Sequence, residues 1–276
     1  GIDPERLYQQ VCNLKIELIL TAHPTEILRR SVSSKFLRIA RLLSEQDRRD
    51  LSDGERFEIQ QSLQRAVTEV WETDEIRRLR PTPVDEAKTG LVSIEHSLWD
   101  VIPRIQRELD HALFKTTGKR LPVDAVPVRF GSWMGGDRDG NPNTTPAVTA
   151  QVCTLTRLKA AEMFWAEIDE LRRDLSMTRC NDALRSELGP DVAEPYRALL
   201  EKVQEKLKAT IKYHTRIYDG YTAGKVVVGT PIPETGIYQS KEELEQPLML
   251  CYQSLLDSGD EVIAAGRLTD VIRRLN

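Results

Sequence analysis

The chain has 276 residues, of which 40% are hydrophobic and 30% charged, enough for one large domain or two ordinary ones with a sizeable core. Its 39 basic and 43 acidic residues give a net charge of −4, which argues against nucleic acid as a partner, because binding phosphates needs a basic surface. No apolar run reaches the roughly 18 residues of a membrane helix, and the N-terminus lacks a signal-peptide pattern, so we expect a cytoplasmic protein with no membrane partner.

The four cysteines predict a reduced protein. They are far apart and form no CxxC pair: Cys12, Cys153, Cys180 and Cys251. Such spacing is typical of free thiols in a cytosolic protein, and it favours neither a disulfide framework nor a zinc site.

The first predicted strand covers residues 15–21 and runs directly into a polar motif, LTAHPTE, at residues 20–26. Pro24 suits the first turn of a helix and biases His23 toward an extended conformation, so the imidazole is expected at the end of the strand. The helix that follows offers free N–H groups and a positive dipole end, and Arg29 and Arg30 add two guanidinium groups. A titratable base beside an anion site suits phosphoryl or carboxyl chemistry.

From these residues alone, a buried structural histidine with two surface arginines explains the first motif equally well. The other three histidines, His96, His111 and His214, lie inside helical stretches without such surroundings, and we interpret them as structural.

Helical periodicity dominates the rest of the chain. Apolar residues recur at helical spacing within residues 59–71, 91–105 and 196–211, with Lys, Arg, Glu and Gln between them. The charge runs at residues 47–50 and 77–80 are interpreted as solvated faces.

The second predicted strand, residues 126–133, leads into the motif FGSWMGGDRDGNP at residues 130–142. Its glycines, Gly135 and Gly136 among them, allow backbone angles closed to other residues and a close approach of a ligand, and Trp133 supplies a flat apolar wall. Four polar residues crowd the same loop: Asp137, Arg138, Asp139 and Asn141.

Other interpretations of this loop are weaker. A calcium loop would need glycine where Pro142 stands and glutamate where Val148 stands. Neither the phosphate-binding nor the dinucleotide glycine spacing is met. A tight structural loop stabilised by its own Asp–Arg pairs remains an alternative to a functional one.

Each predicted strand feeds a turn and then a long helix, the order of an α/β barrel or a doubly wound sheet, in which functional groups collect at the carboxyl ends of the strands. Two strands cannot close a sheet, so either sequence outside this chain completes it or the strands pair locally on a helical body. Residues 219–236, with four Gly and two Pro, are predicted to be a mobile loop, and residues 260–276 a helix.

The two motifs together resemble bacterial-type phosphoenolpyruvate carboxylase. So do the intervening TDEIR at residues 73–77 and RPTPVDEA at residues 80–87, and the resemblance runs through nearly the whole chain in the expected order. It implies a lyase for carbon dioxide fixation, which converts phosphoenolpyruvate and bicarbonate to oxaloacetate and phosphate and so replenishes the tricarboxylic acid cycle.

The resemblance also implies roles for residues. His23 matches the catalytic base that acts on carboxyphosphate, and Trp133 matches the bicarbonate pocket, together with Gly135 and Gly136. Arg29 and Arg30 match residues linked to phosphate or effector binding. The residues Asp137, Arg138, Asp139 and Asn141 would belong to the active-site loop.

The chain departs from this family by its length. Members are much longer, and the acidic ligands of Mg²⁺ or Mn²⁺ are expected outside these 276 residues, so we predict no metal ligand here and an inactive isolated fragment. The fold expected is one N-terminal fragment, residues 1–276, mainly helical with a few strands, as part of a (β/α)8 TIM-type barrel with helical insertions. The whole enzyme is expected to be an allosteric homotetramer that binds regulatory metabolites.

Two other functions remain open on the sequence. One is a phosphotransferase in which His23 carries an acid-labile phosphate. The other is a non-catalytic helical module that binds anions at Arg29 and Arg30.

Overall fold

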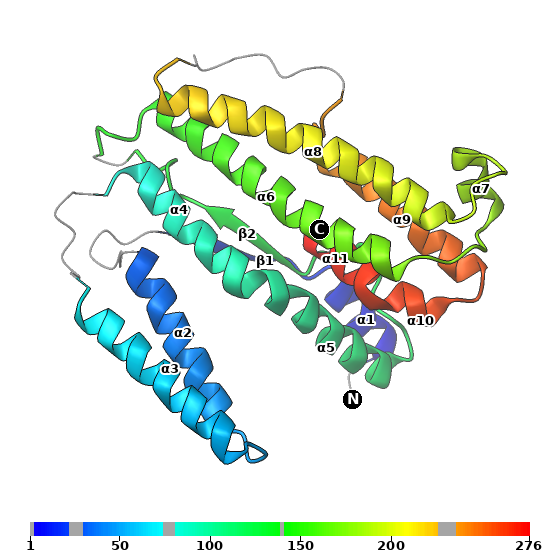
Figure 1. The fold of residues 1–276 in the computed structure, drawn as a ribbon. Coiled ribbons are helices and arrows are strands. Elements are labelled where there is room, and N and C mark those ends of the chain that lie inside the picture. Colours follow the sequence, from blue (N-terminus) through cyan, green and yellow to red (C-terminus); the bar gives the residue numbers. More distant parts are fainter. Residues whose placement is uncertain (1–2, 22–29, 74–80, 139–140, 226–235) are drawn as a thin grey trace.

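The structure, a computed structural model, describes the chain apart from residues 1–2, 22–29, 74–80, 139–140 and 226–235 (Figure 1). The described part is mainly helical, with a two-stranded parallel sheet. The α-helices are α1 (Pro4–Cys12), α2 (Arg30–Gln46), α3 (Asp53–Trp71), α4 (Pro83–Ser93), α5 (Trp99–Thr117), α6 (Pro146–Asp174), α7 (Asp182–Leu188), α8 (Pro195–Thr222), α9 (Lys241–Asp257), α10 (Glu261–Ile263) and α11 (Thr269–Leu275). Two π-helical turns, η1 (Ile94–Leu98) and η2 (Ala264–Leu268), join α4 to α5 and α10 to α11.

Both predicted strands are confirmed, as β1 (Ile16–Leu20) and β2 (Val128–Ser132). They pair with each other in parallel, in a register that runs from Ile16 opposite Val128 to Leu20 opposite Ser132. The carboxyl ends of the two strands therefore lie at the same edge of the sheet.

The main hydrophobic core lies between α6, α8, α9 and α11, and α6 and α8 run side by side for most of their length (Figure 1). The apolar stripe predicted for residues 196–211 is confirmed, because Tyr196, Leu200 and Leu207 are fully buried there. α6 contributes Ile168 and Leu171 to the same core. Burial of a large apolar side chain stabilises the fold by about 1.5–3 kcal/mol, so this core dominates the stability of the described chain.

A hairpin of α2 and α3 projects from this body (Figure 1). A capping box starts α3: the side chain of Ser52 accepts the N–H of Glu55, and the Glu55 carboxylate accepts the N–H of Ser52 at 2.8 Å. The stripe predicted in residues 59–71 is buried only in part, since Val67 is 53% and Trp71 86% exposed. In a hairpin of two helices, each helix buries only the apolar side chains that face the other helix. The remaining apolar side chains of α3 are exposed to solvent.

Residues 219–222 form the last turn of α8, so the start of the predicted loop at residue 219 is wrong, while residues 226–235 lie outside the described part. The local helix-forming pattern of α8 simply continues through Gly220. Of the predicted charged faces, residues 47–50 are exposed, with Arg48 ion-paired to Asp50 at 2.7 Å, and residues 77–80 are not described.

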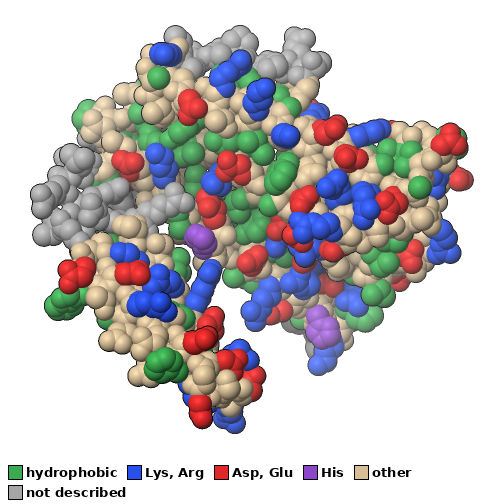
Figure 2. All heavy atoms as spheres, viewed as in Figure 1, with side chains coloured by type: hydrophobic (Ala, Val, Ile, Leu, Met, Phe, Trp, Pro, Cys, Tyr) green, Lys and Arg blue, Asp and Glu red, His purple; other side chains and the backbone are tan. Residues whose placement is uncertain are grey.

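The surface carries charges of both signs, and the described cysteines are unpaired. Acidic and basic side chains are interspersed over the face seen in Figure 2. All four cysteines are free thiols, as predicted. Among the described helices, none has the length and apolar character needed to cross a membrane.

Candidate functional site

The two sequence motifs start side by side. Leu20 ends β1 and begins the first motif, and the backbone N–H of Trp133, directly after β2, donates to the carbonyl oxygen of Leu20 at 3.0 Å. His23 and Arg29 lie outside the described residues, and Arg30 is the first residue of α2. The sheet therefore brings the starts of both motifs together at its carboxyl edge.

A tight turn follows β2. The carbonyl oxygen of Trp133 accepts the N–H groups of Gly136 at 2.9 Å and Asp137 at 3.0 Å. Gly135 has φ +70°, and a Cβ on it would lie 2.5 Å from Val152 of α6. Gly136 has no such restriction, because the nearest atom to a Cβ there would be 3.7 Å away. The first glycine of the pair is therefore required by the backbone, and the second leaves its surroundings open.

Met134 anchors this turn to the helices. Its side chain is buried with Ala87 of α4 and Val152 of α6. It fits because Gly90 of α4 has no side chain: a Cβ at that position would lie 2.0 Å from the Met134 Cε atom. With its neighbour held in this way, Trp133 stays 59% exposed at the edge of the sheet.

Sequence reasoning missed these anchoring residues. The available signal was Gly90, an isolated glycine inside a helical stretch, which costs about 1 kcal/mol relative to alanine and usually has a packing reason. Its partner could not be identified from spacing, because Met134 comes from a different element.

The polar residues of the loop divide into two groups. Asp137 and Arg138 are exposed, whereas Asp139 lies outside the described part. Asn141 holds the next turn: its side-chain oxygen accepts the N–H of Asn143 at 3.0 Å. That turn leads to Thr145, which caps the N-terminus of α6. The loop is thus fixed at both ends, by the sheet and by α6.

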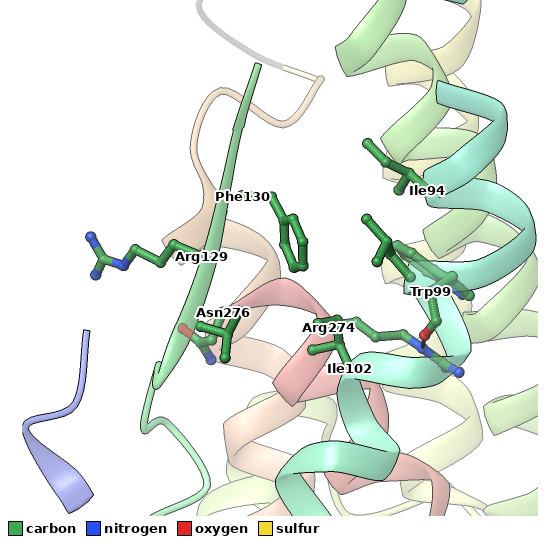
Figure 3. A pocket seen from close by; sticks show the side chains of 9 residues that line it. Ile94, Trp99, Ile102, Arg129, Phe130, Arg274 and Asn276 are labelled. Carbon is green, nitrogen blue, oxygen red and sulfur yellow. Dashed lines mark hydrogen bonds between the residues drawn. The ribbon is translucent and has the colours of Figure 1, made fainter. Parts of the chain in front are cut away.

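The side chains of β2 alternate between the two faces of the sheet. Phe130 points into an apolar cavity of about 340 Å³ between β2 and α5, while Arg129 points the other way (Figure 3). At the far wall, Arg274 is already engaged, by an ion pair with Glu167 at 2.8 Å and a hydrogen bond to the carbonyl oxygen of Trp99 at 2.8 Å. With Arg274 engaged and Arg129 turned away, this cavity offers mainly apolar contact and supports the sheet.

The whole chain matches one family. The sequence model of the family described as "Phosphoenolpyruvate carboxylase" covers residues 1–276. The chain belongs to the phosphoenolpyruvate carboxylase family. It is 48% identical over 274 residues to the phosphoenolpyruvate carboxylase of Pseudomonas fluorescens (strain Pf0-1), and 49% identical over 275 residues to that of Pseudomonas putida (strain GB-1). In both comparisons 99% of this chain is aligned, but it spans only 30% of the relative's length.

Phosphoenolpyruvate carboxylases are lyases that use Mg²⁺. In the part of this chain that the structure describes, no three His, Cys, Asp or Glu side chains gather where they could hold a metal ion. The described residues therefore do not fit a metal centre.

Proposed function

We propose that this chain is the N-terminal part of a phosphoenolpyruvate carboxylase and that His23 and Trp133 act together in converting phosphoenolpyruvate and bicarbonate to oxaloacetate and phosphate. The observation that supports this most is the hydrogen bond between Trp133 and Leu20, which places the starts of both motifs at one edge of the sheet. The carboxyl ends of parallel strands are where α/β proteins place their catalytic groups.

The proposed chemistry begins with phosphoryl transfer from phosphoenolpyruvate to a bicarbonate oxygen, which yields carboxyphosphate and the enolate of pyruvate. His23 then accepts the proton of the carboxyphosphate carboxyl group, and cleavage of the C–O bond releases CO₂ and phosphate. The enolate carbon attacks CO₂ and forms oxaloacetate.

Other residues bind and orient the reactants in this proposal. The exposed indole of Trp133, with Gly135 and Gly136 beside it, forms a wall of the bicarbonate pocket. A flat apolar wall excludes water from carboxyphosphate, which water would otherwise hydrolyse. Arg29 and Arg30 supply guanidinium groups for a phosphate or an anionic effector.

The exposed sheet supports the wider fold of the proposal. On β1, the apolar side chains of Ile16, Leu18 and Ile19 are 43%, 48% and 42% exposed, and they point to both faces of the sheet. Strands that are apolar on both faces are typical of parallel sheets covered on both sides. We therefore propose that further strands extend this sheet into a (β/α)8 barrel in which the α2–α3 hairpin is a helical insertion.

The proposal extends to the whole protein. The isolated 276-residue chain should form no oxaloacetate, because it spans 30% of its relatives' length and the described part holds no metal centre. The whole protein is proposed to use Mg²⁺ or Mn²⁺, to assemble as a homotetramer and to respond to allosteric metabolites.

The decisive experiment replaces His23 in the whole protein with asparagine. Oxaloacetate formation, followed by NADH oxidation with malate dehydrogenase, should fall by about 100-fold or more, the usual effect of losing a general base. Phosphate release should fall less, because carboxyphosphate still forms before the base acts and water can then hydrolyse it to bicarbonate and phosphate. The matched control is His111→Asn, at an exposed position of α5, which should leave both rates unchanged.

Two outcomes would contradict the proposal. Unchanged turnover in His23→Asn would favour the non-catalytic anion-binding module. A stable, acid-labile phosphate on His23 after incubation with phosphoenolpyruvate would favour the phosphotransferase.

A further inference from the structure

A second cavity lies within the helical body. It measures about 320 Å³ and lies between α6 and α8, where the segment before α9 and the end of α11 close it. Most of its wall is apolar, with Phe164, Leu207 and Leu244 among the lining side chains. A mainly apolar pocket with a few polar groups is the usual form of a small-molecule site, and about 300 Å³ is the lower end of the usual size.

His214 of α8 lines this cavity and is only 5% exposed. The ring contacts Tyr213 edge-to-face, with 5.1 Å between the ring centroids. Burial, and secondarily the charge of Arg157, lower the pKa of the His214 imidazole, so the ring is neutral and offers one N–H donor and one acceptor. A ligand oxygen in the cavity would be a suitable acceptor for that N–H.

Arg157 of α6 provides a cation at the same cavity. It makes no ion pair with any residue that the structure describes, although its charge is close enough to affect His214. The neighbouring charges have partners: Glu243 pairs with Lys206 at 2.6 Å, and Lys241 pairs with Glu245 at 3.9 Å. The guanidinium of Arg157 is therefore the charge left available to a ligand.

We propose that this cavity binds a small organic carboxylate, whose carboxylate group lies between Arg157 and the N–H of His214 and whose hydrocarbon part packs against Phe164 and Leu207. A guanidinium binds a carboxylate through parallel charge-assisted hydrogen bonds. The apolar wall selects an anion that carries a hydrophobic body over a small hydrated one. This inference does not depend on the proposed carboxylase activity.

The test is calorimetric titration of the whole protein with three probes. Benzoate has both the charge and the apolar body, acetate has only the charge, and benzyl alcohol has only the body. Benzoate should bind in a saturable manner at least tenfold more tightly than either of the other two. Equal binding of benzyl alcohol, or no saturable binding of benzoate, would overturn the proposal.

Two variants locate the binding. Arg157→Gln changes an exposed side chain of α6 and should weaken benzoate binding at least tenfold, and His214→Gln should weaken it by a smaller factor. The matched control is Arg56→Gln on the distant α3, which should bind benzoate as the unmodified protein does. Circular dichroism checks the fold of each variant. Unchanged benzoate affinity in a folded Arg157→Gln protein would refute the assignment, even if His214→Gln fails to fold.

Discussion

A buried hydroxyl pair links α8 to α9, and its removal tests how the helical body is held together. The hydroxyls of Tyr196 and Ser254 share a hydrogen bond of 2.8 Å, and both residues are fully buried. The Ser254 oxygen also accepts the backbone N–H of Asn181 at 3.0 Å, just before α7. The Ser254 oxygen therefore connects α8, α9 and the residue before α7. Because Tyr196 and Ser254 share a hydrogen bond, the effects of removing their hydroxyls on the free energy of unfolding should not be additive.

The expected magnitudes differ for the two single variants. Tyr196→Phe removes one hydrogen bond and should lower the free energy of unfolding by about 1 kcal/mol. Ser254→Ala also leaves the N–H of Asn181 without its acceptor, and should cost about 2–4 kcal/mol. In the double variant the shared bond is lost only once, so its cost should be about 1 kcal/mol less than the sum of the two.

The assay is equilibrium unfolding in urea, with free energies obtained by linear extrapolation. Tyr221→Phe, at the end of α8, is the matched control and should change the free energy of unfolding by less than about 0.5 kcal/mol. If the costs of Tyr196→Phe and Ser254→Ala add within about 0.3 kcal/mol, the shared hydrogen bond does not couple the helices and the reasoning is wrong.

Three further predictions concern the loop, the thiols and pH. Gly135→Ala should lower the free energy of unfolding, because the residue has positive φ and its Cβ would meet Val152, whereas Gly136→Ala should change that free energy little. Equal effects of the two substitutions in urea unfolding would contradict the geometry. Iodoacetamide at neutral pH should modify the exposed Cys153 in the folded protein and spare Cys251, because burial raises the pKa of the Cys251 thiol to about 12. Mass spectrometry that detects alkylated Cys251 as early as alkylated Cys153 would refute this. The pKa of His214 is lowered, so the residue contributes stability above pH 6.5, and this contribution is lost as the pH falls through the pKa of the folded state. In His214→Gln, the free energy of unfolding in urea should therefore fall less on acidification than in the unmodified protein. An unchanged dependence of that free energy on pH would contradict the prediction.

Local patterns predicted the strands but not their pairing. Residues 15–21 and 126–133 were identified because short apolar runs stand between turn-forming residues, and β1 and β2 lie inside those limits. That they pair with each other in parallel depends on residues far away in sequence, which no local pattern reports. The same limit applied to α3, where the periodicity identified an apolar stripe but not whether anything covers Trp71.

The site was predicted in a similar, partial way. The motif around Trp133 and its double glycine stood out from composition, and the structure shows which glycine the backbone requires. The insertion of Met134 against Gly90 was missed, because it is a tertiary contact between a loop and a helix. The role of His23 stays a prediction, since the residue lies outside the described part.

The parallel sheet has a consequence for how the chain folds during synthesis. The two strands pair across roughly 110 residues, so β1 leaves the ribosome long before β2 exists. At about 5–20 residues per second, β1 waits roughly 5–20 s without its partner. Throughout that time its apolar side chains and free backbone edge can pair with other nascent chains. Early binding of a chaperone to β1 would protect the very strand that carries the first motif.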